Sequence, residues 1–324
     1  MAYTTIDDPT IYFNTKLYTG NGGTNAQTGV GFQPDWVWIK NRSGSDQHAL
    51  YDSVRGANKY LSSSRNIAEA TQSDGLMSFN SDGFTVGADG GVNTNSNNFV
   101  SWNWKKTATA GFDIVSFTGS GSQRTVSHNL GVKPSMIIVK NRSATENWIV
   151  YDKINGAGNF MALNLNSASA ASSSMFGVEP TTSVFTVGTS NATNKSSSNM
   201  IAYCFAEKQG YSKFGSYIGN GDEDSTFIYT GFKPAFVMLK RTDSTTNWYI
   251  NDTKRDPFNK ATHSLFPNLS DAENTTGWFV DYVSNGFKIR DTGSEVNASG
   301  STHIYMAFAE QPLVTSTGIP ATAR

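Results

Sequence analysis

The stretch GFQPDWVWIKNR, from Gly31 to Arg42, decides the fold because two near-copies of it occur later in the chain. They read GVKPSMIIVKNR from Gly131 and GFKPAFVMLKR from Gly231, with the proline and the lysine at the same phase each time. The spacing predicts three tandem repeats of about 100 residues within the 324-residue chain. A unit of that size is long enough to hold its own core.

Each copy predicts a buried strand. In the first copy, Trp36 and Trp38 share one face of the strand, whereas Val37 and Ile39 share the other. Because both faces are apolar, we expect this strand to lie in the middle of a sheet that is covered on both sides.

The same further segments surround each copy: an opening strand with a glycine turn, a second strand, a hairpin signal and an aromatic closing strand. In the first unit they are KLYTGNG (16–22), HALYD (48–52), NSDGFTVG (80–87) and FVSWNWK (99–105). Trp104, Phe205 and Phe308 occupy one slot of the closing strand. Many short strands with Gly, Asn and Asp turns predict an all-β fold, with each unit β-sandwich-like.

Long variable loops separate the second strand from the hairpin, near residues 56–75, 156–180 and 256–280. They show no sustained helical stripe, although a short helical turn near Ala68 or Asp271 is expected. We expect these loops to point outward, since recognition often lies on such segments.

The repeat also sets the predicted boundaries. Residues 1–107 form the first repeat with an N-terminal docking segment, 108–209 the second and 210–311 the third. Residues 312–324 fall outside the pattern, so we expect them to form an extended C-terminal arm.

Composition excludes several classes of protein. The formal net charge is -1 and charged residues make up 16%, below the roughly 25% of an average domain. This does not fit a nucleic-acid-binding protein, which needs a basic surface. No run approaches the roughly 20 apolar residues of a membrane span. The start MAYTTIDDPTIYF lacks the features of a secretory signal, although the polar, aromatic-rich composition is typical of proteins that work outside cells.

Residues that carry chemistry are scattered. The four histidines, His48, His128, His263 and His303, lack the spacing of a metal pair, and His48 stands where the other units have Trp148 and Trp248. We therefore expect His48 and the two tryptophans to be packing residues. We also expect Cys204, the only cysteine, to be a small structural residue of the closing strand.

Two charged positions recur in phase in all three units. They are Lys40, Lys140 and Lys240, and Asp52, Asp152 and Asp252. Each set lies at strand ends, so a structural ion pair or a turn hydrogen bond explains them better than catalysis does.

The surface candidates are few. Asp222, Glu223 and Asp224 supply hard oxygen ligands that suit calcium, but a solvated turn is the better interpretation. Trp278 lies in a variable loop and is the candidate for stacking on a sugar ring. No nucleophile elbow or phosphate-binding loop is present, and no cofactor is expected.

The phrases GFQPDWVWIKNRSGSDQHALYDSVRGANKYLSS, SDGFTVG, VSWNWK, AYCFAEKQGYSKFGSYIGNG and GFKPAFVMLKRTDSTTNW resemble repeat modules in virion structural proteins of tailed bacteriophages, especially marine ones. The opening MAYTTIDDP is similar to the start of such proteins. The resemblance covers nearly the whole chain and implies a tail- or fibre-type virion protein. It brings no catalytic residues.

Three functions are therefore weighed. The first is a non-enzymatic virion surface protein of the tail or tail fibre. It would be made in the host cytoplasm, released by lysis, and would contact a host cell-surface glycan or protein. It would also contact other virion proteins and form a homo-oligomer, with a trimer favoured. The second is a capsid decoration or head-fibre protein that stabilises the particle. The third is a polysaccharide depolymerase, which needs two carboxylates roughly 5–10 Å apart.

Overall fold

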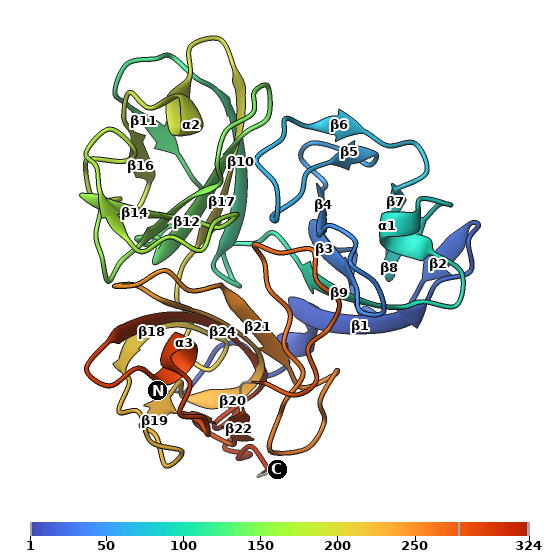
Figure 1. Cartoon of the computed structure of the whole chain (residues 1–324), viewed down its shortest axis with the longest axis vertical. Coiled ribbons are helices and arrows are strands. Elements are labelled where there is room, and N and C mark those ends of the chain that lie inside the picture. Colours follow the sequence, from blue (N-terminus) through green and yellow to red (C-terminus); the bar gives the residue numbers. More distant parts are fainter. Residues whose placement is uncertain (1, 278, 323–324) are drawn as a thin grey trace.

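The computed structural model describes residues 2–277 and 279–322. The chain is all-β, and its strands form three lobes around a common centre (Figure 1). We call residues 1–107, 108–209 and 210–311 the first, second and third units. In Figure 1 these are the blue to cyan, the green and the yellow to red lobes.

The elements follow one another in similar order in each unit. The first unit contains the 3-10 helix η1 (Pro9–Ile11) and the strands β1 (Phe13–Thr19), β2 (Asn25–Gln27), β3 (Trp36–Asn41), β4 (Ala49–Asp52), β5 (Lys59–Tyr60), β6 (Ala70–Thr71), β7 (Leu76–Asn80), β8 (Gly83–Val86) and β9 (Asn98–Trp104). The second unit contains β10 (Phe112–Thr118), β11 (Arg124–Ser127), β12 (Met136–Asn141), β13 (Ile149–Asp152), β14 (Asn159–Ala162), β15 (Ala170–Ala171), β16 (Val184–Val187) and β17 (Asn199–Phe205). The third unit contains β18 (Ser212–Ile218), β19 (Phe227–Tyr229), β20 (Phe232–Arg241), β21 (Tyr249–Asp252), β22 (Val280–Val283), β23 (Gly286–Ile289) and β24 (Thr302–Pro312).

Each unit has a main antiparallel sheet in which the proline-led strand is central, as predicted. The strand orders begin β1-β9-β3-β4, β10-β17-β12-β13 and β18-β24-β20-β21. The registers pair Trp36 with Trp104, Met136 with Phe205, and Phe236 with Phe308. The aromatic slot of the closing strand therefore lies beside the same position of the central strand in all three sheets.

A smaller sheet covers the outer face of each main sheet and gives the units their sandwich-like character. The orders are β2-β8-β7, β11-β16 and β19-β23-β22. In the first unit, Val37 and Ile39 point into a local core with Phe84 and Val86. The predicted Asp-Gly hairpin forms between β7 and β8.

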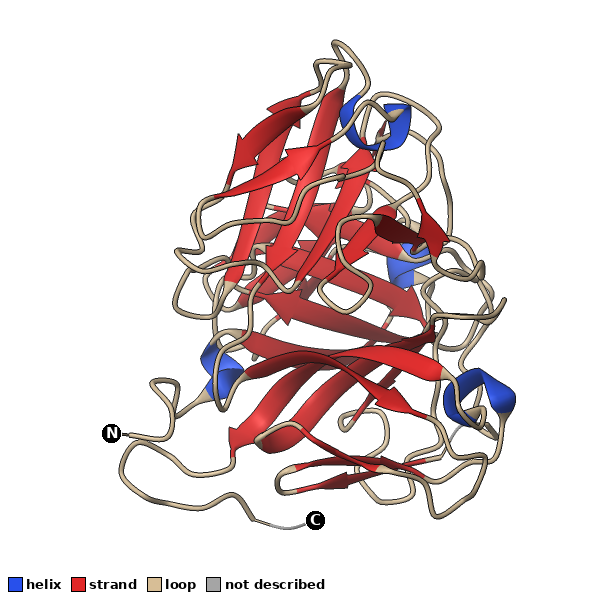
Figure 2. Cartoon of the chain, turned by 90° about the vertical axis from the view of Figure 1, so that its left-hand side faces the viewer, coloured by secondary structure: helices blue, strands red, loops and turns tan. Residues whose placement is uncertain are grey.

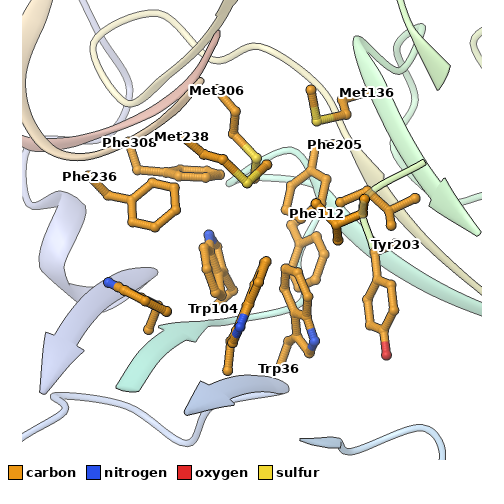
Figure 3. Packing of buried hydrophobic residues seen from close by; sticks show 14 of the residues in the cluster. Trp36, Trp104, Phe112, Met136, Tyr203, Phe205, Phe236, Met238, Met306 and Phe308 are labelled. Carbon is orange, nitrogen blue, oxygen red and sulfur yellow. The ribbon is translucent and has the colours of Figure 1, made fainter. Parts of the chain in front are cut away.

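The inner faces of the three main sheets meet in one shared core (Figure 3). Trp36 of the first unit stacks on Tyr203 of the second at a ring-centroid distance of 4.5 Å. Phe205 lies 6.1 Å from Phe308 of the third unit, and Trp104 lies 5.7 Å from Phe236. Each unit thus contacts both others through aromatic rings, and such pairs contribute about 0.5–1.5 kcal/mol beyond area burial.

The variable loops are partly buried between units, which corrects the expectation that they point outward. Leu61 and Leu265 lie in the shared core, and Ser62 is fully buried. Backbone hydrogen bonds then join each loop to the next unit: Glu69 N to Arg142 O (2.8 Å), Ser169 N to Thr242 O (2.8 Å) and Glu273 N to Arg42 O (2.9 Å). The loops bond first to second, second to third and third to first, so the ring of units is closed.

Short helices lie just before the closing strands rather than near Ala68 or Asp271, where helical turns were expected. They are α1 (Gly90–Asn93), α2 (Asn191–Asn194) and α3 (Ser294–Asn297). Each ends in a buried asparagine that holds the glycine turn of its unit. Asn93 Nδ2, for example, donates to the carbonyl oxygens of Gly23 (2.5 Å) and Gly87 (2.7 Å).

The described parts of the two termini lie at the same end of the molecule (Figure 2), beside the third unit (Figure 1). Ile6 of the predicted docking segment is buried in the shared core, and Thr4 Oγ1 donates to Gln209 O at 2.7 Å. The predicted C-terminal arm is not extended throughout, because it turns back after Pro312: Ala321 N donates to Leu313 O at 2.8 Å. Among the described residues, no helix has the length and apolar character needed to cross a membrane.

Candidate functional site

The four histidines lie apart, and each makes contacts with different residues. His48 is fully buried; its Nδ1 accepts from Trp38 Nε1 at 2.8 Å, and its Nε2 donates to Phe266 O of the third unit at 3.0 Å. Burial lowers the pKa of His48 well below its usual range, so the ring is neutral. His128 contacts Thr181 O, His303 stacks on Tyr217, and His263 lies near Asp256.

The tryptophans at the His48 position are packing residues, as expected. Trp148 and Trp248 are buried, and their indole Nε1 atoms donate to Ser62 O (2.7 Å) and Ala162 O (3.0 Å) of the preceding unit. His48, Trp148 and Trp248 thus make an equivalent hydrogen bond to the preceding unit at each of the three junctions. Trp278, the stacking candidate, lies outside the described residues.

The remaining candidates are Cys204 and the acidic cluster of Asp222, Glu223 and Asp224. Cys204 is fully buried, and burial raises the pKa of its thiol well above the usual range. Asp222, Glu223 and Asp224 are exposed, and Asp224 Oδ1 accepts from Lys288 (2.5 Å) and Arg290 (3.2 Å). Within residues 2–277 and 279–322, no three His, Cys, Asp or Glu side chains are arranged to hold a metal ion.

The in-phase lysines make turn hydrogen bonds. Lys40 Nζ donates to Asn41 O (2.6 Å) and Gly44 O (2.9 Å), and Lys140 and Lys240 also donate to the turns that follow their strands. Burial lowers the pKa of each of the three lysines to about 8. Of the two explanations weighed from the sequence, the turn hydrogen bond is the one that the structure shows.

The in-phase aspartates begin two chains of charged groups that cross unit junctions. Asp52 pairs with Arg55, which contacts Glu69, and Glu69 forms a bidentate pair with Arg142 of the second unit at 2.8 and 2.9 Å. Tyr203 of the second unit donates to Asp52 at 2.7 Å. This first junction therefore carries a continuous ionic network.

The junction from the third unit to the first repeats that network with other residues. Asp252 pairs with Arg255, Arg255 NH1 lies 2.9 Å from Glu273 Oε1, and Glu273 forms a bidentate pair with Arg42 at 2.7 and 2.9 Å. Trp102 Nε1 donates to Asp252 at 3.0 Å.

The junction from the second unit to the third has neutral residues at the equivalent positions. Asn155 stands in place of Arg55 and Arg255, and Ser169 in place of Glu69 and Glu273. Thr242 stands in place of Arg142 and Arg42, and Met306 in place of the hydrogen-bond donors Tyr203 and Trp102. Asp152 instead accepts from Asn155 Nδ2 at 2.9 Å. Burial raises the pKa of Asp152 because this hydrogen bond does not offset the loss of hydration.

The ionic networks also lower the pKa values of the two glutamates at these junctions, Glu69 and Glu273. Burial alone would raise the pKa of Glu69, but hydrogen bonds from Arg142 and attraction to Arg55 outweigh it, so the pKa is lowered. Arg42 and Arg255 lower the pKa of Glu273 in the same way. Both carboxylates are therefore held ionised by their arginines.

A surface pocket of about 310 Å³ lies where the N-terminal segment meets the start of the third unit. Its wall includes Tyr3, Glu207, Gln209, Gly210, Ser212, Lys213, Tyr229, Thr230 and Gly231. The pocket joins the N-terminal segment, the end of the second unit and the first strands of the third.

Two tyrosines define the rim of this pocket. Tyr3 OH donates to Gly231 O at 2.7 Å and lies 3.3 Å from Tyr229 OH. Gly231 has φ of 81°, and a Cβ there would lie 2.6 Å from Tyr3 OH, so the approach of Tyr3 requires glycine. Because the Tyr3 proton is directed to Gly231, the Tyr229 hydroxyl is the donor between the two rings, and its oxygen can accept from a ligand.

One carboxylate of the pocket wall, that of Glu207, faces two lysines. Glu207 Oε1 lies 2.7 Å from Lys153 Nζ and 3.8 Å from Lys213 Nζ, and it accepts from Phe214 N at 3.0 Å. Sequence reasoning missed this pocket because its residues lie far apart in the chain and no motif links them. The one signal that could have indicated the pocket is Tyr229, an aromatic residue where the second unit has Ser127.

We predict unequal effects when the in-phase aspartates are changed to asparagine one at a time. Asp52→Asn and Asp252→Asn leave a buried arginine without its closest carboxylate and are expected to lower the free energy of unfolding by about 3 kcal/mol or more. Asp152→Asn keeps a neutral partner and is expected to cost less than about 1 kcal/mol. Urea unfolding measures this, and equal effects at all three positions would contradict the assignment of the junctions.

The lowered pKa values of Glu69 and Glu273 predict a pH dependence. Their contribution to stability is complete above their unfolded pKa and is lost as the pH falls through their folded pKa, roughly from pH 5 downward. The double variant Glu69→Gln/Glu273→Gln should be less stable at pH 7 and lose less stability on acidification. Ser169→Ala, at the neutral junction, should retain the wild-type pH slope. A wild-type slope in the double variant would refute the prediction.

Comparison with known proteins places the chain in a family. Curated proteins give no match to this sequence. One family model matches residues 8–312, which span all three units and the pocket wall apart from Tyr3; it describes a domain of unknown function, DUF7483. Since this match covers nearly the whole chain, the protein belongs to the DUF7483 family.

Proposed function

We propose that the protein is a non-enzymatic surface protein of a bacteriophage virion, a tail or tail-fibre component that contacts the host cell. The sequence phrases that resemble virion repeat modules support the virion location. The contact role is supported by one observation, a group of exposed apolar side chains on the third unit and the N-terminal segment beside it.

That group, which we call the third-unit patch, consists of Ile218, Phe227 and Tyr229 with Tyr3 beside them. The first three side chains are 52%, 43% and 53% exposed. Phe227 and Tyr229 are alternate residues of β19, so they share its outer face, and Thr226 Oγ1 donates to Ile218 O. Exposed aromatic and aliphatic side chains that gather on one face are typical of interaction surfaces.

The other two units have smaller or more polar residues at these positions. The strand registers align Ile218 with Thr19 and Thr118, Phe227 with Ala26 and Thr125, and Tyr229 with Ser127. The strands that carry these residues pair in the same way in the three units. The third-unit patch is therefore not needed to form a unit, which supports a role in contact with another molecule.

The proposed partners follow from this location. The third-unit patch would contact a host cell-surface glycan or protein, and other faces would contact virion proteins. A homo-trimer remains our proposal for the assembly. The protein would be made in the host cytoplasm, enter the virion there and be released by lysis.

We predict that antibodies against the exposed Asp222–Asp224 turn label the tail of purified particles in electron micrographs. Phage carrying Phe227→Ala should assemble in normal yield but adsorb to host cells about tenfold more slowly, since single anchors often dominate an interface. Val178→Ala, an exposed apolar change on the second unit, should adsorb normally.

Label spread over the head would contradict the tail assignment and support the capsid decoration role. Shortening of purified host polysaccharide by the protein would contradict a non-enzymatic role. Unchanged adsorption by the Phe227→Ala phage would contradict the contact role of the third-unit patch.

A further inference from the structure

We propose that the pocket between Tyr3 and Tyr229 binds a sugar residue of a host-surface glycan, an assignment that rests on the proposed contact with the host cell. The pocket adjoins the third-unit patch because Tyr3 and Tyr229 belong to both. A volume of about 310 Å³ lies at the small end of ligand pockets, which suits a small ligand or one unit of a chain.

The tyrosines supply the apolar part of such a site. Tyr229 is 53% exposed at the rim, so its ring is open to a ligand. A sugar ring has an apolar face of C–H groups that packs on an aromatic face, while its hydroxyls remain at the edge. The Tyr229 oxygen lies at that edge and can accept a hydrogen bond from a sugar hydroxyl, because its own proton is directed to Tyr3.

The polar wall suits the hydroxyl groups of a sugar. It holds one cationic and one anionic side chain, Lys213 and Glu207, and Glu207 Oε1 lies 2.7 Å from Lys153 Nζ and 3.8 Å from Lys213 Nζ. Alternating donors and acceptors such as the Gln209 amide, the Lys213 ammonium and the Gly231 carbonyl suit the hydroxyls of a sugar.

The site is fixed before a ligand arrives. Tyr3 is held by its hydrogen bond to Gly231 O, and the next residue, Thr4, is buried with its hydroxyl on Gln209 O at 2.7 Å. Burial raises the pKa of Tyr3 above its usual range, so this hydroxyl stays protonated. Little side-chain freedom remains to be lost on binding, which favours affinity in a small site.

The test uses the full-length protein on a printed array of bacterial-surface oligosaccharides. Saturation-transfer NMR with the methyl glycosides of glucose, galactose, mannose and N-acetylglucosamine then measures binding to single sugars. We expect roughly millimolar dissociation constants for a single sugar. Tyr229→Ala should weaken binding about tenfold or more, whereas Tyr229→Phe, which keeps the ring, should retain most of it.

Phe258→Ala is the matched control, because Phe258 is a 78% exposed aromatic residue of the same unit outside the pocket wall. It should bind as the wild type does. Absence of binding to every array sugar and methyl glycoside would overturn the proposal. So would equal binding by Tyr229→Ala and the wild type. If particles are labelled at the tail but no sugar binds, only the ligand assignment fails; sugar binding with label on the head would contradict the tail function alone.

Discussion

The inner faces of three sheets are buried against one another, and the rest of the structure depends on that packing. Each central strand has two apolar faces because one covers the local core of its unit and the other enters the shared core. A unit taken alone would expose the rings of Trp36 and Trp104 to water. At about 25 cal/mol per Å², exposure of two such side chains is a large fraction of the net stability of a domain. The units therefore act as one folding body.

The junctions add specificity to a core that is itself largely non-directional. Two junctions carry partly buried Asp–Arg–Glu–Arg networks, which require every partner in place. The junction between the second and third units relies on neutral hydrogen bonds, such as that from Trp248 Nε1 to Ala162 O. Because the frame is shared, individual surfaces can change without loss of the fold. The third unit shows this most clearly, since Phe227 and Tyr229 stand where other units have alanine, threonine or serine.

The sequence predicted features that repeat in phase, and it failed for features made by contacts between units. The central strand and its slot beside Trp104 followed from a period of two and from copies of one motif. The sequence did not predict that the inner face of each main sheet packs on the other two units, because an apolar face can be buried against any apolar surface. The loops were misjudged because serine-rich sequence around Ser62 is typical of exposed segments, yet here its polar atoms are satisfied at a junction. The ionic networks were not predicted because Glu69 and Glu273 do not recur in phase: the second unit has Ser169 at that position.

The shared core is tested most directly by differential scanning calorimetry of the intact chain at neutral pH. A single transition is predicted, with a calorimetric enthalpy equal to the van't Hoff enthalpy, because no unit can lose its inner face without exposing the other two. Two or three resolved transitions, each with the enthalpy expected for about 100 residues, would show that the units are stable independently and would contradict this account.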